Sequence, residues 1–117
     1  MMLISNNIFP YRIDIKSREP LQFEVILKNP NPLPKTISYE ILFPDGITID
    51  AKGSKKSEIY KLGELKSGEA RSFKYKLHPN SNLRIGTIEI IVRAYEHYGT
   101  YDNIEQTTEK VITIRVV

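Results

Sequence analysis

Apolar and polar residues alternate along most of this chain, in short runs that turn-forming residues separate. The clearest case is the segment 60–77, YKLGELKSGEARSFKYKL, in which the turn 66–69 interrupts an alternation that resumes at Phe73, Tyr75 and Leu77. A period of two belongs to a β-strand, because successive side chains of a strand point to opposite faces. The segment therefore predicts a half-buried antiparallel hairpin on either side of a Ser-Gly turn.

The same alternation predicts further strands at 9–16, 21–28, 36–43, 47–49, 85–98 and about 107–117. No window has the apolar spacing of an amphipathic helix. The apolar residues expected to face the core are Tyr11, Ile13, Ile15, Leu21, Phe23, Val25, Leu27, Ile37, Tyr39, Ile41, Phe43, Leu65, Ile88, Ile90, Val92, Ala94, Ile112, Ile114 and Val116. Together these runs predict an all-β, immunoglobulin-like, two-sheet antiparallel β-sandwich of about seven to eight strands. A length of 117 residues fits a single domain, 1–117.

The composition and charge of the chain exclude some kinds of functional site. The chain has no cysteine, which excludes disulfides, thiolate metal sites and a cysteine nucleophile. The net charge of +3 is dispersed, and the only local cluster is Lys52, Lys55 and Lys56. We interpret this cluster as a solvated loop, so there is no strong nucleic-acid signal, although a weak nucleic-acid binder would use it. The content of Lys, Glu, Ile and Tyr suits a thermophile.

The chain carries no membrane or secretion signal that we can identify. No apolar run approaches the ~20 residues of a membrane helix, so we expect no membrane insertion. The N-terminal residues lack the basic start and the small-residue cleavage site of a signal peptide. We expect a cytoplasmic protein if the chain is full-length, and an extracellular one if it is a fragment of a larger surface protein.

Catalytic and metal-binding groups are sparse. His78 and His97 lie in no recognisable motif, and we interpret both as partly exposed imidazoles in loops or at strand ends. Gly63 and Gly68 are turn glycines that precede no helix, so they do not form a phosphate loop. We therefore predict that the chain is not an enzyme and has no cofactor. The residues that could supply oxygen ligands to a metal, which we interpret as turn formers, are Asp45, Asp50, Asp102 and Asn103.

Two features favour a binding role. The apolar residues Ile26, Leu42, Ile91 and Val111 occupy positions that alternation points outward. If the third, sixth and seventh principal strands share a sheet, the last three are neighbours. They would be flanked by a cross-strand pair of Glu40 and Arg93. Ile26 lies outside this group.

The second feature is a tyrosine-rich loop after the long strand, with Tyr95, His97, Tyr98 and Tyr101. These rings offer either a contact surface or a cap for the core. We therefore predict a non-enzymatic protein-interaction or assembly module whose partner is a protein or a second copy. The alternative is a carbohydrate-binding or cell-surface structural module. The candidate partner-binding residues are Leu42, Ile91, Arg93, Tyr95, Tyr98 and Tyr101.

Four short motifs resemble one known family. Residues 27–31 (LKNPN) resemble its "V-x-N-x-G" strand exit, and 43–47 (FPDGI) its "L-P-x-G-v" corner. Residues 62–69 (LGELKSGE) resemble its "l-G-x-L-x-x-G-e" hairpin, and 85–88 (IGTI) its "a-G-x-y" strand start. In this order, over about 20–117, the chain resembles the cell-adhesion-related (CARDB-like) sandwich domains of archaea and bacteria. The resemblance implies an immunoglobulin-like fold and no catalytic residues.

Overall fold

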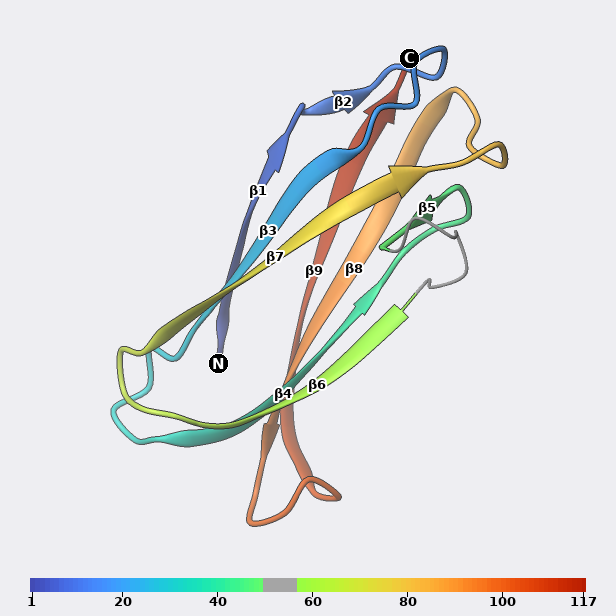
Figure 1. The fold of residues 1–117 in the computed structure, drawn as a ribbon. Coiled ribbons are helices and arrows are strands. Elements are labelled where there is room, and N and C mark those ends of the chain that lie inside the picture. The colour runs from blue at the N-terminus through green and yellow to red at the C-terminus, as the bar shows by residue number, and fades with distance from the viewer. Residues whose placement is uncertain (50–56) are drawn as a thin grey trace.

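Two β-sheets pack face to face in the computed structural model, which describes residues 1–49 and 57–117 (Figure 1). The four-stranded sheet has the order β1-β3-β7-β5, from β1 (Leu3–Phe9), β3 (Leu21–Lys28), β7 (Ala70–Pro79) and β5 (Ile47–Thr48). The five-stranded sheet has the order β2-β9-β8-β4-β6, from β2 (Arg12–Ile13), β9 (Ile104–Val116), β8 (Gly86–His97), β4 (Lys35–Leu42) and β6 (Ser57–Leu65). In the described part of the chain, no helix is long and apolar enough to cross a membrane.

The core lies between the sheets and follows the predicted alternation. In β3 every second side chain is buried, from Leu21 to Leu27, and the residues between them face outward. Burying one such leucine or valine contributes roughly 1.5–3 kcal/mol. At the centre, the Tyr39 ring lies 4.7 Å from the Phe73 ring and 4.9 Å from the Tyr60 ring, measured between centroids. These rings join β4 and β6 of one sheet to β7 of the other.

The N-terminal segment differs from the predicted single strand at 9–16. The chain forms β1 in one sheet, leaves it after Phe9, and forms β2 in the other sheet, parallel to β9. Proline has no N–H to donate to a ladder, so Pro10 ends the strand and separates the two. Ile13 is buried as predicted, but Tyr11 is 72% exposed, so its prediction as a core residue is wrong.

The segment 60–77 forms two strands with the predicted buried faces, but the two strands do not make a hairpin. β6 pairs with β4 in the five-stranded sheet, whereas β7 pairs with β3 in the four-stranded sheet. The turn between them therefore crosses from one sheet to the other. It is held by Asn29, whose carbonyl accepts a hydrogen bond from Gly68 N (2.7 Å) and whose N–H donates to Glu69 O (3.0 Å).

The other strands lie close to their predicted places. β3 spans the predicted residues, β4, β5 and β8 differ from prediction by one or two residues at their ends, and β9 begins about three residues earlier. β7 extends to Pro79, so His78 lies at a strand end, partly exposed, as predicted. β4, β8 and β9 share a sheet, as the third, sixth and seventh principal strands were expected to do.

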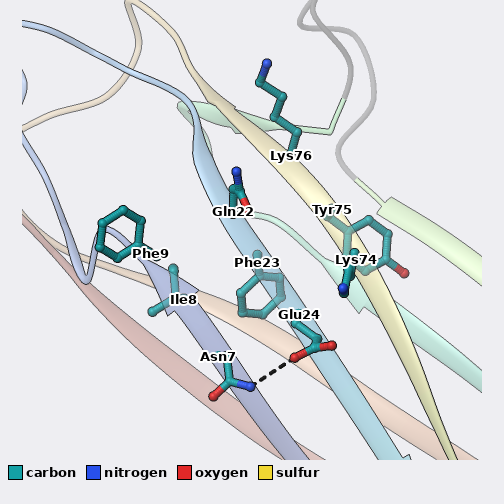
Figure 2. Close-up of a pocket in the computed structure, with 9 residues that line it drawn as sticks. All are labelled: Asn7, Ile8, Phe9, Gln22, Phe23, Glu24, Lys74, Tyr75 and Lys76. Carbon is teal, nitrogen blue, oxygen red and sulfur yellow. Dashed lines mark hydrogen bonds between the residues drawn. The ribbon is translucent and has the colours of Figure 1, made fainter.

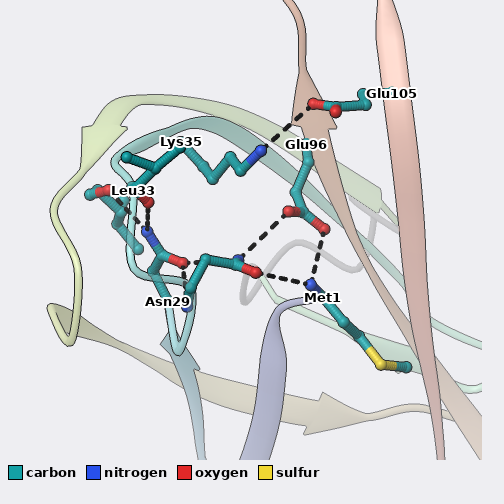
Figure 3. A network of polar contacts seen from close by, with 8 residues as sticks. Met1, Asn29, Leu33, Lys35, Glu96 and Glu105 are labelled. Carbon is teal, nitrogen blue, oxygen red and sulfur yellow. Dashed lines mark hydrogen bonds and ion pairs between the residues drawn. The ribbon is translucent and has the colours of Figure 1, made fainter.

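The side chain of Asn29, which is fully buried, organises the proline-rich connection after β3 (Figure 3). Its amide nitrogen donates to Leu33 O (3.1 Å) and Leu65 O (3.0 Å), and its oxygen accepts from Asn31 N (3.0 Å). The amide of Asn31 reaches Glu96 Oε1 at 3.5 Å. Proline has no N–H to donate to a ladder, so this asparagine supplies hydrogen bonds that a regular element would otherwise provide.

Among the described glycines, Gly46 is expected to be the least tolerant of substitution. Its φ is +96°, and an added Cβ would lie 2.8 Å from Leu83 Cα and 2.9 Å from Leu83 N. We predict that Gly46→Ala lowers the free energy of unfolding by about 2 kcal/mol, from backbone strain plus overpacking. Gly68→Ala is the control, because Gly68 also has a positive φ (+76°) but no heavy atom within 4 Å of an added Cβ. Equal losses in urea denaturation would show that the contact with Leu83 does not matter.

Candidate functional site

The outer face of the five-stranded sheet carries a row of apolar side chains at one register level. Leu42 on β4 pairs with Ile91 on β8, and Ile91 pairs with Val111 on β9. Leu42 and Ile91 are half-buried, and Val111 is 44% exposed. The structure therefore brings these three residues together as the sequence predicted. We refer to Leu42, Ile91 and Val111 as the outer apolar row.

A charged row lies next to it along the strands. The guanidinium of Arg93 lies 3.0 Å from Glu109 Oε2 and 3.5 Å from Glu40 Oε1, so the predicted pair of Glu40 and Arg93 is present. The hydrogen bond to Glu109 is the main cause of the raised pKa of Arg93. On β6, Ile59 pairs with Glu40 in the ladder and is 66% exposed. Both acids share one cationic neighbour, Arg93, and Ile59 adds apolar surface at the edge of the face.

Tyr95 lies on the same face, two residues beyond Arg93 along β8. Its hydroxyl donates to Glu40 Oε1 at 2.9 Å, which links it to the charged row. Burial is the main cause of its raised pKa, and the hydrogen bond to the Glu40 carboxylate is the next. Tyr95 thus stays protonated and acts as a hydrogen-bond donor. Leu42, Ile91, Arg93 and Tyr95, all predicted as binding residues, therefore lie on one surface.

The tyrosine-rich loop between β8 and β9 lies at one end of the molecule (Figure 1), and its two tyrosines behave differently. The hydroxyl of Tyr101 accepts a hydrogen bond from Gly63 N at 2.8 Å, and its ring packs edge-on against His97 at 5.0 Å. The Lys61 ammonium lies 5.1 Å from the centre of the same ring. Tyr98, in contrast, is 75% exposed. Tyr101 therefore fixes the loop to β6, and Tyr98 keeps its ring exposed.

His97 is buried, which contradicts its interpretation as a partly exposed imidazole. Its Nε2 lies 2.6 Å from the hydroxyl oxygen of Ser38, which is also buried. Acyl transfer by such a pair needs a third group that orients the histidine. Nδ1 of His97 has no hydrogen-bond partner among the described residues. The Tyr101 ring packs against His97, and we interpret the contact of Ser38 with His97 as a buried polar contact within the sheet.

The described part of the chain shows no candidate metal site, and the predicted basic cluster lies outside it. No group of three or more His, Asp or Glu side chains gathers there to hold a metal ion. Asp50 and the lysines of the cluster, Lys52, Lys55 and Lys56, lie outside the described residues.

The four-stranded sheet has a groove that our reading of the sequence missed. It has a volume of about 480 Å³ and is lined by Asn7, Ile8 and Phe9 of β1, Gln22, Phe23 and Glu24 of β3, and Lys74, Tyr75 and Lys76 of β7 (Figure 2). The lining includes no residue of the five-stranded sheet, so the groove opens on the outer face. The sequence signal that was available is Pro10, which ends β1 and leaves Phe9 on the outward side, 76% exposed.

Comparisons with known proteins show no family. No family model matches the chain, and no curated protein matches it. Among solved structures, it is similar to the Pseudomonas fluorescens alkylpurine DNA glycosylase AlkC, bound to DNA containing an abasic site analog. The identity is 12% and the TM-score 0.46, and the match covers 98% of this chain and 30% of that protein. The chain thus spans less than a third of the protein that it matches.

This comparison corrects one prediction. From the sequence we expected that the chain is not an enzyme, but the solved protein that it matches is one, a DNA glycosylase. The exclusion of enzymatic activity is therefore wrong as a conclusion from the sequence, and we withdraw it. The weak likeness assigns no reaction to this chain.

Proposed function

We propose that this chain is a protein-interaction or assembly module, which binds through the outer face of the five-stranded sheet. The observation that carries the proposal is the outer apolar row, whose three side chains are adjacent in register on β4, β8 and β9. Side chains that face solvent on a sheet are usually polar, and clustered apolar ones mark contact surfaces. Ile59 extends this surface to the edge strand β6.

The charges around the row are compatible with burial against a protein. Arg93 lies between Glu40 and Glu109, so covering the face leaves none of these three groups without an opposite charge. Such a face suits an apolar protein surface better than a phosphate backbone, which needs unpaired cations.

The partner that we propose is a second copy of the chain. Along β8, Glu89 and Arg93 lie two residues on either side of Ile91. Glu89 forms no ion pair with any described residue. A two-fold axis through Ile91 would place Glu89 of each copy opposite Arg93 of the other, in both directions, while the apolar rows stack.

We further propose an immunoglobulin-like topology for the sandwich and membership of the CARDB-like group. The strand orders β1-β3-β7 and β9-β8-β4 support the first, because they match the two sheets of that topology. The motifs at 27–31, 43–47, 62–69 and 85–88 support the second. The alternative of a carbohydrate-binding or cell-surface module that uses the 98–101 loop loses support, because Tyr101 is engaged with Gly63 and His97.

The test is self-association measured by sedimentation equilibrium. We predict that the wild type dimerises, and that Leu42→Glu combined with Ile91→Lys weakens the dimer at least tenfold, because both rows then bury charge. The matched control is Leu3→Glu with Ile26→Lys, the same changes on the outer face of the other sheet. Val111→Arg, at a more exposed position, serves if the double variant fails to fold. A wild type that stays monomeric at millimolar concentration contradicts the proposal.

A further inference from the structure

The groove lies on the outer face of the four-stranded sheet, whereas the face proposed for dimerisation belongs to the five-stranded sheet. Two rows of side chains, each running across three strands, form it. Phe9, Gln22 and Lys76 are aligned across β1, β3 and β7, and so are Asn7, Glu24 and Lys74 (Figure 2). The rows are two residues apart, roughly 7 Å, and the outer strands of the three are roughly 10 Å apart. Ile8, Phe23 and Tyr75 point into the core, so backbone forms the floor. These dimensions fit a single six-membered ring with its substituents.

The groove has three kinds of group that face solvent. The Phe9 ring is 76% exposed at one corner. At the opposite side Lys74 and Lys76 form no ion pair with any other described residue. Between them lie planar polar groups: Gln22, and Glu24, which accepts a hydrogen bond from the Asn7 amide at 2.9 Å. The groove therefore combines an aromatic surface, hydrogen-bonding groups and two unpaired cations.

We propose that this groove binds a pyranose sugar that carries a carboxylate, as in an acidic oligosaccharide. The apolar face of the sugar ring would lie against Phe9, and its carboxylate would reach the ammonium groups of Lys74 and Lys76. Its hydroxyls can both donate to Glu24 and accept from amide groups. A DNA strand has no hydroxyl donors along its backbone, so the Glu24 carboxylate would repel it. Charge and hydrogen-bonding capacity thus favour an acidic sugar over DNA.

The experiment titrates the isotope-labelled chain with three probes and follows its amide resonances by NMR. The probes are hexagalacturonate, the neutral sugar maltohexaose, and a thymidine hexanucleotide. We expect hexagalacturonate to shift resonances of β1, β3 and β7 around the groove, with an affinity that falls as salt is added. Maltohexaose should bind at least fivefold more weakly, because it lacks the carboxylates.

Three variants locate the site. Phe9→Ala should weaken hexagalacturonate binding about tenfold, through loss of the aromatic contact. Lys74→Gln with Lys76→Gln should weaken it at least fivefold and reduce the salt dependence. Lys28→Gln is the matched control, because Lys28 is exposed on the same sheet face but outside the groove, and it should change binding little.

Four results would overturn the proposal. They are the absence of shifts with hexagalacturonate, equal binding of maltohexaose, tighter binding of the hexanucleotide, and equal losses in Lys28→Gln and the double lysine variant. The changed side chains are exposed, so each variant is expected to keep the wild-type amide spectrum away from the groove. A spectrum that collapses in Phe9→Ala leaves the double lysine variant to decide the outcome.

Discussion

Replacing Tyr39 with alanine is expected to lower the free energy of unfolding by about 3–5 kcal/mol. Tyr39 is fully buried at the centre of the core, where its ring packs against Tyr60 of its own sheet and Phe73 of the other. Its removal leaves a cavity that strands of two sheets cannot close without shifting their ladders. Urea denaturation followed by circular dichroism measures the loss.

The matched variant Tyr39→Phe separates the ring from the hydroxyl. The Tyr39 hydroxyl is buried and has no hydrogen-bond partner among the described residues. Burying an unpaired hydroxyl costs free energy, so Tyr39→Phe should leave stability unchanged or raise it. A loss of more than about 1 kcal/mol in Tyr39→Phe would show that the hydroxyl forms a hydrogen bond in the folded protein.

The second large effect is expected at Asn29. Asn29→Ala removes the donor to Leu65 O and Leu33 O and the acceptor for Asn31 N. Since these groups lie in a buried or partly buried region, we predict a loss of about 3 kcal/mol in the free energy of unfolding. The crossing turn at 66–69 should also become more open to hydrogen exchange, because it hydrogen-bonds to the Asn29 backbone.

The variant Asn29→Asp separates the hydrogen bonds that the Asn29 side chain donates from the one that it accepts. An aspartate keeps the acceptor for Asn31 but cannot donate to Leu65 O when ionised, and its charge is buried. It should destabilise the fold at neutral pH at least as much as alanine. Wild-type stability in Asn29→Asp would mean that the donor bonds to Leu33 and Leu65 contribute nothing.

The strands and their buried faces were predictable because alternation is a local signal of burial. In β3 and β8 each predicted inward residue is buried or half-buried, since these strands have the core on one side only. The outer apolar row was predictable for the same reason. Once β4, β8 and β9 are neighbours, outward apolar residues at matching positions must meet.

The partners of β6 and β7 were not predictable from that signal. Alternation on both sides of a turn is the same whether the two strands pair with each other or enter different sheets. The decision rests on distant residues, above all Asn29, which holds the crossing turn. Tyr11 was misplaced because the chain bends at Pro10 and Tyr11 between β1 and β2, so Tyr11 belongs to neither strand.

The contact of Ser38 with His97 and the groove on the four-stranded sheet could not be predicted from the sequence either. Ser38 and His97 are diagonal neighbours in the β4–β8 ladder, and the apolar pattern does not show which strands pair. The irregular pairings next to them, between Ile37 and Ser38 and between Glu96 and His97, also leave no mark in that pattern. The groove depends on three strands that lie far apart in sequence. Its lysines and Phe9 each look like ordinary surface residues until the ladder aligns them.

The most direct test of the proposed contact face is a dilution series of methyl NMR spectra. If the outer apolar row joins two copies, the methyl resonances of Leu42, Ile91 and Val111 will shift with protein concentration. Those of Leu3 and Ile26, on the outer face of the other sheet, will stay in place. Shifts confined to Leu3 and Ile26, or no shift at any methyl group up to millimolar concentration, would contradict the proposal that this face joins two copies.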